Sequence, residues 1–280
     1  DYLRRIFRFF RKAKGQNCIH SFCVAIVTDI MAFFTAGFRH FFFMAKNIIL
    51  VPTNFSSRAN LAYRQSINFA ERTKGEVYLL NVIPHKSNRE NLDYEIDMIQ
   101  NQVLNLIDNY DDSIRRRVHT RIEYGAVNQT IVKVEKEIKP DFIFMGSDAA
   151  RNDHNRSITL KLIDKISCPL VVFAGRYDKV GCDRIVLPVD LTKETKQKVD
   201  LAVKIAKIYG AKVYAVSATG SRDKETLKQL EDKMSEVKAI FDKLEIECET
   251  RLMKTEANVE SMANAVNDFA DDIEASAIII

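Results

Sequence analysis

A tandem repeat constrains the fold of this chain more than any other feature. One offset of 136 residues, the separation of Pro52 from Pro188, aligns the first parts of the two copies without a gap. The same offset puts Phe142 against Ile278, although gaps could cancel between these two regions. The aligned pairs include Asn54 with Asp190, Ser56 with Thr192, Ala70 with Ala206, Val77 with Val213 and Tyr78 with Tyr214. Because the same alignment offset recurs over more than 80 residues, it predicts that one structural unit is present twice.

Within the first copy, short apolar runs alternate with long amphipathic segments. A continuous run such as Ile48 to Val51 is typical of a strand buried on both faces of a parallel sheet. We predict strands at 48–51, 77–83, 118–124, 141–146 and 170–173, and helices from Ser56 or Ser57 to Lys74 and at 92–109, 127–138 and 157–166. Right-handed crossovers then predict an α/β, Rossmann-like domain with a five-stranded parallel sheet flanked by helices.

The repeat also predicts the domain organisation. Residues 44–175 form the first copy, 176–182 a linker and 183–280 the second copy. By the same offset Ile280 corresponds to Phe144, so the second copy is expected to stop inside its fourth strand. We therefore expect the given chain to be a fragment of a longer protein.

The first 43 residues carry the basicity of the chain. They hold seven Arg and Lys against Asp1 and Asp29, which is +5, so a total of +4 leaves the other residues at −1. A nearly neutral body lacks the concentrated basic face that nucleic-acid binding requires, and we expect no nucleic-acid partner.

Three interpretations of residues 1–43 remain open: sequence foreign to the fold, a membrane-associated leader, or a structured extension. A basic stretch followed by an aromatic-rich apolar one has the order of a leader, but His20, Asp29, Arg39 and His40 interrupt it. A charge near the middle of a spanning helix costs about 2.5–3.5 kcal/mol. Because a natural domain start follows at Met44, the first interpretation is favoured, and a membrane contact is expected only if the segment is genuine.

Cysteine and histidine give no sign of a metal site or a disulfide framework. Cys18, Cys23, Cys168, Cys182 and Cys248 are scattered without C-x-x-C spacing, which favours a reducing cytoplasm. His85, His119 and His154 stand far apart, so each is interpreted as a surface or packing residue.

The strings Lys46-Asn-Ile-Ile-Leu-Val-Pro-Thr-Asn-Phe-Ser56, Tyr78-Leu-Leu-Asn-Val-Ile83 and Cys168-Pro-Leu-Val-Val172 resemble the universal stress protein family. The second copy opens in the same style, from Asp183 to Thr192. The resemblance implies a five-stranded Rossmann-like fold, dimerisation through the last strand, and a role in stress adaptation that often involves nucleotide binding. It therefore implies a pseudo-dimer of the two copies, or a homodimer.

Nucleotide-binding members of that family place an acidic residue after the first strand, adenine at the end of the second, and phosphates in a Gly-x-x-Gly, nine residues, Gly-Ser/Thr loop after the fourth. By this resemblance the candidate nucleotide-binding residues of the first copy are Asn54, Val82, Gly146, Ser147, Arg156 and Ser157. The copy departs from the pattern, because Asn54 is not acidic and the later glycines of the loop are absent. The loop is interpreted as a solvated segment that caps a helix at Ser157.

In the second copy, Asp190 has the acidic position and Leu191 follows it. An aspartate after a buried strand is equally a helix cap. The phosphate loop of this copy would lie beyond Ile280, so ATP is a candidate ligand and no cofactor is assigned.

Three functions are weighed. The leading one is a non-enzymatic tandem stress protein that acts as a regulatory or interaction module with an unidentified protein partner. The second is a stress protein that binds ATP, and slowly hydrolyses it, through the second copy. The third is a membrane-tethered sensor, which rests only on residues 1–43. No Walker loop, nucleophile elbow or metal-ligand spacing indicates an enzyme.

Overall fold

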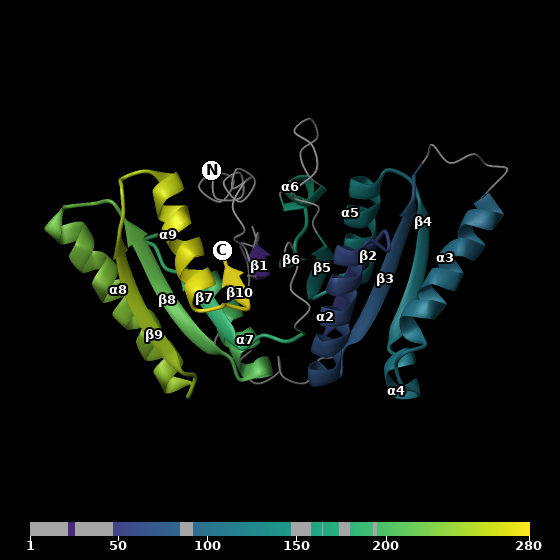
Figure 1. Cartoon of the computed structure of the whole chain (residues 1–280), viewed down its shortest axis with the longest axis horizontal. Helices are drawn as coiled ribbons and strands as arrows, with labels where there is room; N and C mark the ends of the chain where they lie inside the picture. The colour runs from purple at the N-terminus through teal and green to yellow at the C-terminus, as the bar shows by residue number, and fades with distance from the viewer. Residues whose placement is uncertain are drawn as a thin grey trace. The chain divides into compact units, whose positions relative to one another are not determined.

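The computed structural model describes residues 22–25, 47–84, 92–146, 158–163, 165–173, 180–192 and 195–280. These residues divide into two compact units: β2 to β6 with their helices form one, and β7 to β10 form the other together with β1. Each unit is described by itself below (Figure 1).

The unit that contains the first copy is built on a parallel sheet in the order β4-β3-β2-β5-β6. Its strands are β2 (Ile48–Thr53), β3 (Glu76–Ile83), β4 (Val118–Tyr124), β5 (Phe142–Gly146) and β6 (Leu170–Phe173). The five predicted strands and their doubly wound order are confirmed. The central strand β2 is lined by Ile49, Leu50 and Val51, none of which is exposed, as expected for a sheet covered on both faces.

Helices cover both faces of this sheet. They are α2 (Ser57–Thr73), α3 (Leu92–Ile107), the short α4 (Asp112–Arg115), α5 (Val127–Ile138) and α6 (Ile158–Ile163). Right-handed crossovers put α2 and α3 on one face, and α5 and α6, which contact each other, on the other. The sequence pattern did not predict α4, a single turn that Asp111 caps by accepting a hydrogen bond from the Ile114 N–H (3.1 Å).

The second unit repeats this order as β1-β10-β7-β8-β9, again parallel. Its strands are β7 (Arg184–Pro188), β8 (Lys212–Thr219), β9 (Cys248–Lys254), β10 (Ala277–Ile279) and β1 (Phe22–Ala25). Its helices are α7 (Thr195–Tyr209), α8 (Lys224–Lys243) and α9 (Val259–Asp272), and the crossover rule puts α9 on the face opposite α7 and α8.

The repeat holds in three dimensions, but its offset changes twice along the chain. Ile49 pairs with Phe142 in the first sheet, and Ile185, its equivalent, pairs with Ala277 in the second. Val77 pairs with Val118 in the first sheet, whereas Val213 pairs with Cys248 in the second, so the offset falls from 136 to 130 at the third strand and is 135 at the fourth. The second copy is therefore six residues shorter than the first between its second and third strands and five residues longer between its third and fourth. The near-constant offset at Phe142 arises because these two length changes almost cancel.

Most of residues 1–43 lie outside the described residues, so their exclusion from the fold and the domain boundaries stay predictions. Four of them, Phe22–Ala25, form β1 beside β10, at the place that β6 has in the first sheet. In the part of the chain that the structure describes, no helix is both long and apolar enough to cross a membrane. The predicted pairing of the two copies also stays a prediction.

Candidate functional site

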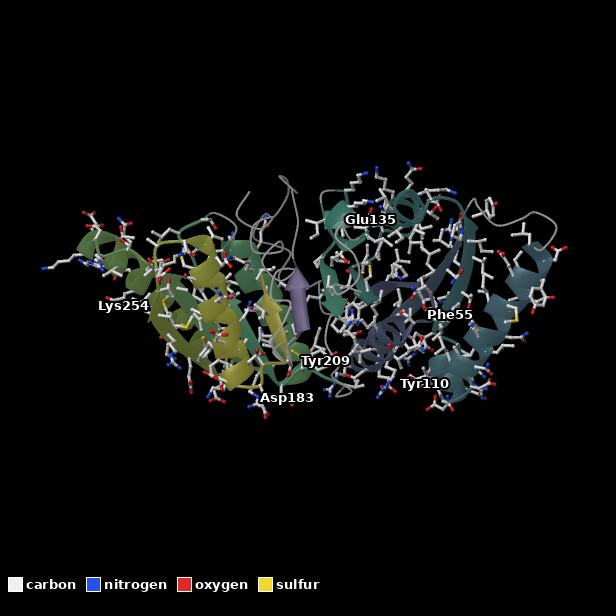
Figure 2. All side chains as sticks on the ribbon, turned by 45° about the horizontal axis from the view of Figure 1, so that its top comes forward. Phe55, Tyr110, Glu135, Asp183, Tyr209 and Lys254 are labelled. Carbon is white, nitrogen blue, oxygen red and sulfur yellow. The ribbon has the colours of Figure 1, made fainter. Side chains whose placement is uncertain are left out.

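The candidate site lies at the carboxyl ends of the central strands, where parallel α/β sheets hold their ligands. In the first copy the ends of β2 and β3 are tied together, because the buried Asn81 side chain donates a hydrogen bond to the Thr53 carbonyl oxygen (3.0 Å). Beyond β2 the chain turns sharply at Phe55, whose φ is 57°. Figure 2 labels Phe55 at this turn.

Asn54 uses its side chain within this turn. Its Oδ1 accepts a hydrogen bond from the Ser56 N–H (3.2 Å), while the Thr53 hydroxyl accepts one from the Phe55 N–H (3.0 Å). Ser56 caps α2 by accepting from the Ala59 N–H (3.4 Å). Asn54 is therefore an exposed turn residue that stabilises the entry into α2.

Gly146 ends β5 against the first turn of α2. A Cβ atom on this glycine would lie 2.4 Å from the Arg58 carbonyl carbon and 2.6 Å from the Ala59 nitrogen. The missing side chain therefore allows strand and helix backbones to approach closely. Backbone packing thus explains why position 146 is a glycine, and no phosphate-binding role is needed to explain it.

In the second copy, Asp190 is the centre of a polar cluster. Its Oδ1 accepts hydrogen bonds from the Thr192 N–H (3.0 Å), the Thr192 hydroxyl (2.5 Å) and the Thr195 hydroxyl (2.9 Å). Its Oδ2 lies 3.2 Å from the ammonium of Lys198, which projects from the second turn of α7. The Lys198 side chain is only 8% exposed, and this carboxylate lies against its buried ammonium.

The cluster keeps Asp190 ionised. Burial alone would raise its pKa, but the charge of Lys198 and the hydrogen bonds from Thr192 and Thr195 outweigh burial, and the pKa of Asp190 is lowered. The carboxylate that the family pattern offers to a ligand is thus already neutralised by groups of its own chain.

The structure places only some of the other predicted site residues. Val82 is half-buried near the end of β3, and Leu191 is 49% exposed directly after Asp190. Ser147, Arg156 and Ser157 lie outside the described residues, so the interpretation of their loop stays a prediction.

Thr195 and Lys198 are site residues that the sequence analysis missed. The 136-residue offset gives the signal, because it aligns them with Ala59 and Ala62 in the first copy. The acid, the hydroxyl and the base therefore occur together in the second copy and are all replaced in the first.

The side chains of the described cysteines and histidine are packed against other residues of the fold. Cys168, Cys182 and Cys248 are buried free thiols, and burial raises their pKa to about 12, about 12 and about 11. His119 stacks on Tyr78 (4.7 Å between ring centroids) with its Nε2 3.3 Å from Glu76, whereas His85 and His154 lie outside the described residues. Among the described residues there is no group of three or more His, Cys, Asp or Glu that could hold a metal ion.

Comparison with known proteins agrees with this architecture. Residues 46–174 match the model of the universal stress protein family. No curated protein matches the sequence.

Two solved structures resemble most of the chain. A universal stress protein from Archaeoglobus fulgidus DSM 4304 is 17% identical with a TM-score of 0.64, over 83% of this chain and 84% of that one. A Pseudomonas aeruginosa UCBPP-PA14 protein assigned to the universal stress proteins is 14% identical with a TM-score of 0.50, over 85% of this chain and 94% of that one. At these identities the likeness shows the fold alone.

A third structure is a universal stress protein in complex with cAMP. It is 14% identical with a TM-score of 0.36, over 45% of this chain and 95% of that one. So distant a likeness carries no ligand over to this chain.

Proposed function

The chain carries a universal stress protein domain at residues 46–174, and from this premise we propose that it acts as a non-enzymatic regulatory or interaction module in the response to stress. The recurrence of that fold in the second unit supports the proposal that the chain is a tandem member. A cytoplasmic location and an unidentified protein partner belong to the same proposal.

The observation that carries the proposal is that the side chains of Asn54 and Asp190 are already hydrogen-bonded within the chain. Both stand where nucleotide-binding members of the family have their acidic residue, and both are engaged by their own turns. A ligand hydroxyl would have to displace the Lys198 ammonium and two threonine hydroxyls from Asp190. This exchange would leave the buried ammonium without its carboxylate, which is costly in a protein interior.

Thermal unfolding of the full chain with and without Mg-ATP tests the proposal. A ligand present at 100 times its Kd stabilises the folded state by about 2.7 kcal/mol. For a protein of this size the unfolding midpoint would rise by roughly 5–10 °C. We expect no rise with millimolar Mg-ATP.

The alternative is a stress protein that binds ATP through the second copy, and the partial exposure of Asp190, 26% of its side chain, is the observation that favours it. In that case Asp190→Ala would abolish the thermal shift and Asn54→Ala would leave it unchanged. Such a pattern would replace our proposal by the alternative.

A further inference from the structure

The second unit has a cavity of about 290 Å³ on the face of its sheet that α9 covers. It lies between β8, β9 and α9, which run side by side in Figure 1. This volume is just below the range of small-molecule pockets, roughly 300–1,000 Å³. None of the Asp190 cluster lines it, although Val216 of its lining accepts a hydrogen bond from the Val189 N–H (2.7 Å), next to Asp190.

The floor of the cavity is apolar and partly aromatic. Val216 is fully buried, Phe269 is 6% exposed, and Ile273 and Tyr214 are half-buried beside them. The rings of Tyr214 and Phe269 meet edge to face, with centroids 5.9 Å apart. Such a floor takes up an apolar group of a ligand.

The rim of the cavity carries both signs of charge. Arg251 stacks on Phe269, with its guanidinium carbon 5.1 Å from the ring centroid, and it has no ion pair to any residue that the structure describes. A stacked guanidinium keeps its N–H groups available in its own plane, where a carboxylate is bound by two parallel hydrogen bonds.

Glu249 provides the negative charge two residues earlier on β9. It shares the Lys212 ammonium with Glu247, at 2.5 Å and 2.6 Å. One ammonium cannot neutralise two carboxylates, so this part of the rim keeps an excess negative charge.

The first unit shows what the same position looks like when its charges are paired. Arg121 stands on β4 opposite Leu80, as Arg251 stands on β9 opposite Val216. Arg121 is bound by Glu123 and Glu137, and Lys133 lies 3.4 Å from Glu123.

The second copy has lost these partners. Met253 stands where Glu123 would be, two residues after the arginine. Asp272 ends α9, five residues before Ala277 of β10, as Glu137 lies five residues before Phe142 of β5. It makes no ion pair with Arg251. The arginine is therefore retained without the carboxylates that engage it in the first copy.

We propose that this cavity binds an apolar α-amino acid as a zwitterion. Arg251 takes the carboxylate, Glu249 takes the ammonium, and the side chain rests on Val216, Phe269 and Ile273. A zwitterion satisfies a rim of mixed sign, whereas a simple anion would be repelled by Glu249 and a simple cation by Arg251. The site is separate from the proposed function and does not depend on it.

The test is a titration of the full isotope-labelled chain, followed by the NMR shifts of amides in β8, β9 and α9. The probes are L-phenylalanine, 3-phenylpropionate without the amine, phenethylamine without the carboxylate, and neutral benzyl alcohol. We expect saturable shifts with millimolar L-phenylalanine and at least about tenfold weaker binding of the other three.

Variants test which group of the ligand each of the two charged residues binds. Arg251→Gln should weaken L-phenylalanine about tenfold and strengthen phenethylamine, because the repulsion of the amine is removed. Glu249→Gln should strengthen 3-phenylpropionate for the corresponding reason. Met253→Glu restores the partner that Arg121 has and should abolish binding in a folded protein. Arg222→Gln, an exposed arginine in the loop before α8, is the matched control and should bind as the wild type does.

Two results would overturn the proposal. One is the absence of saturable shifts at these strands and helix in the millimolar range. The other is evidence that the charges of the rim play no part, either because benzyl alcohol binds as tightly as L-phenylalanine or because Arg251→Gln leaves L-phenylalanine binding unchanged.

Discussion

Asp190 and Asn54 follow equivalent strands, yet they stabilise the chain in different ways. The asparagine closes a turn with one hydrogen bond, whereas the aspartate joins β7 to α7 through Thr192, Thr195 and Lys198. Ala59 and Ala62 stand at the places of Thr195 and Lys198, so the first copy could not hold an ionised aspartate in the same way.

Lys198→Met tests the ion pair at the scale of the residue. Methionine keeps the volume of the stem and leaves the Asp190 carboxylate without its cation, and we expect unfolding to become easier by about 1–3 kcal/mol at pH 7. Chemical denaturation measures this loss. The double variant Asp190→Asn with Lys198→Met should recover part of it, and a single variant as stable as the wild type would contradict the role of the pair.

The loss of stability caused by Lys198→Met should depend on pH in a defined way. The folded state lowers the pKa of Asp190, so the pair's contribution is complete above the unfolded pKa, about 3.9, and is lost as the pH falls through the lower folded pKa. The difference between wild type and Lys198→Met should therefore be constant near neutral pH and shrink below about pH 4. Denaturation series at several pH values would show it, and a difference that grows on acidification would be against it.

Two contacts between elements position the first sheet around its site. Gly146 brings the end of β5 against the start of α2. On the other face Glu135 of α5, labelled in Figure 2, is 2% exposed, and its Oε1 accepts hydrogen bonds from the N–H and hydroxyl of Ser167, just before β6. Both contacts join a helix to the end of a neighbouring strand.

Gly146→Ala should destabilise the protein by about 1–3 kcal/mol, because its Cβ would lie within 2.6 Å of the Arg58 and Ala59 backbone and neither atom can move without shifting the helix. Thermal or chemical unfolding gives the value. Gly210→Ala is the control: nothing lies within 4 Å of its Cβ, and its φ of 68° costs only about 1 kcal/mol. Equal effects of the two substitutions would show that the close approach at Gly146 is unimportant.

Glu135→Leu should cost about 1–3 kcal/mol, since the N–H and hydroxyl of Ser167 each lose a hydrogen bond worth about 0.5–1.5 kcal/mol. Glu135→Gln keeps an acceptor oxygen and removes a buried charge, so it should be close to neutral. Denaturant midpoints of the two variants test this ordering. A glutamine variant as unstable as the leucine variant would mean that the charge itself is needed.

At the scale of the whole molecule, the repeat made most of the fold predictable. Apolar runs such as Ile48 to Val51 and helical periodicity determine the strands and helices, and the second copy follows by the offset. The single turn α4 was not predictable, because it depends on local hydrogen bonds that leave little periodic signal. The two length changes before β9 and β10 were hidden because they almost cancel, so the offset returns nearly to 136 at the fourth strand.

The candidate site was predictable only in part. The sequence places Asn54 and Asp190 after their strands, but it cannot show which groups engage them. Lys198 lies eight residues beyond Asp190, and its role depends on α7 folding back along the sheet so that its second turn faces the end of β7. The position of Arg251 and Glu249 at the rim of the cavity likewise follows from the pairing of β8 with β9, which the sequence alone does not show.

The most direct test of the central claim, that the residues at the nucleotide positions are engaged by the chain itself, is a calorimetric titration of Mg-ATP into the full protein. We predict no saturable heat in the millimolar range for the wild type or for Asn54→Asp, whose turn would gain a carboxylate. Saturable binding to the wild type that Asp190→Asn removes would contradict the account.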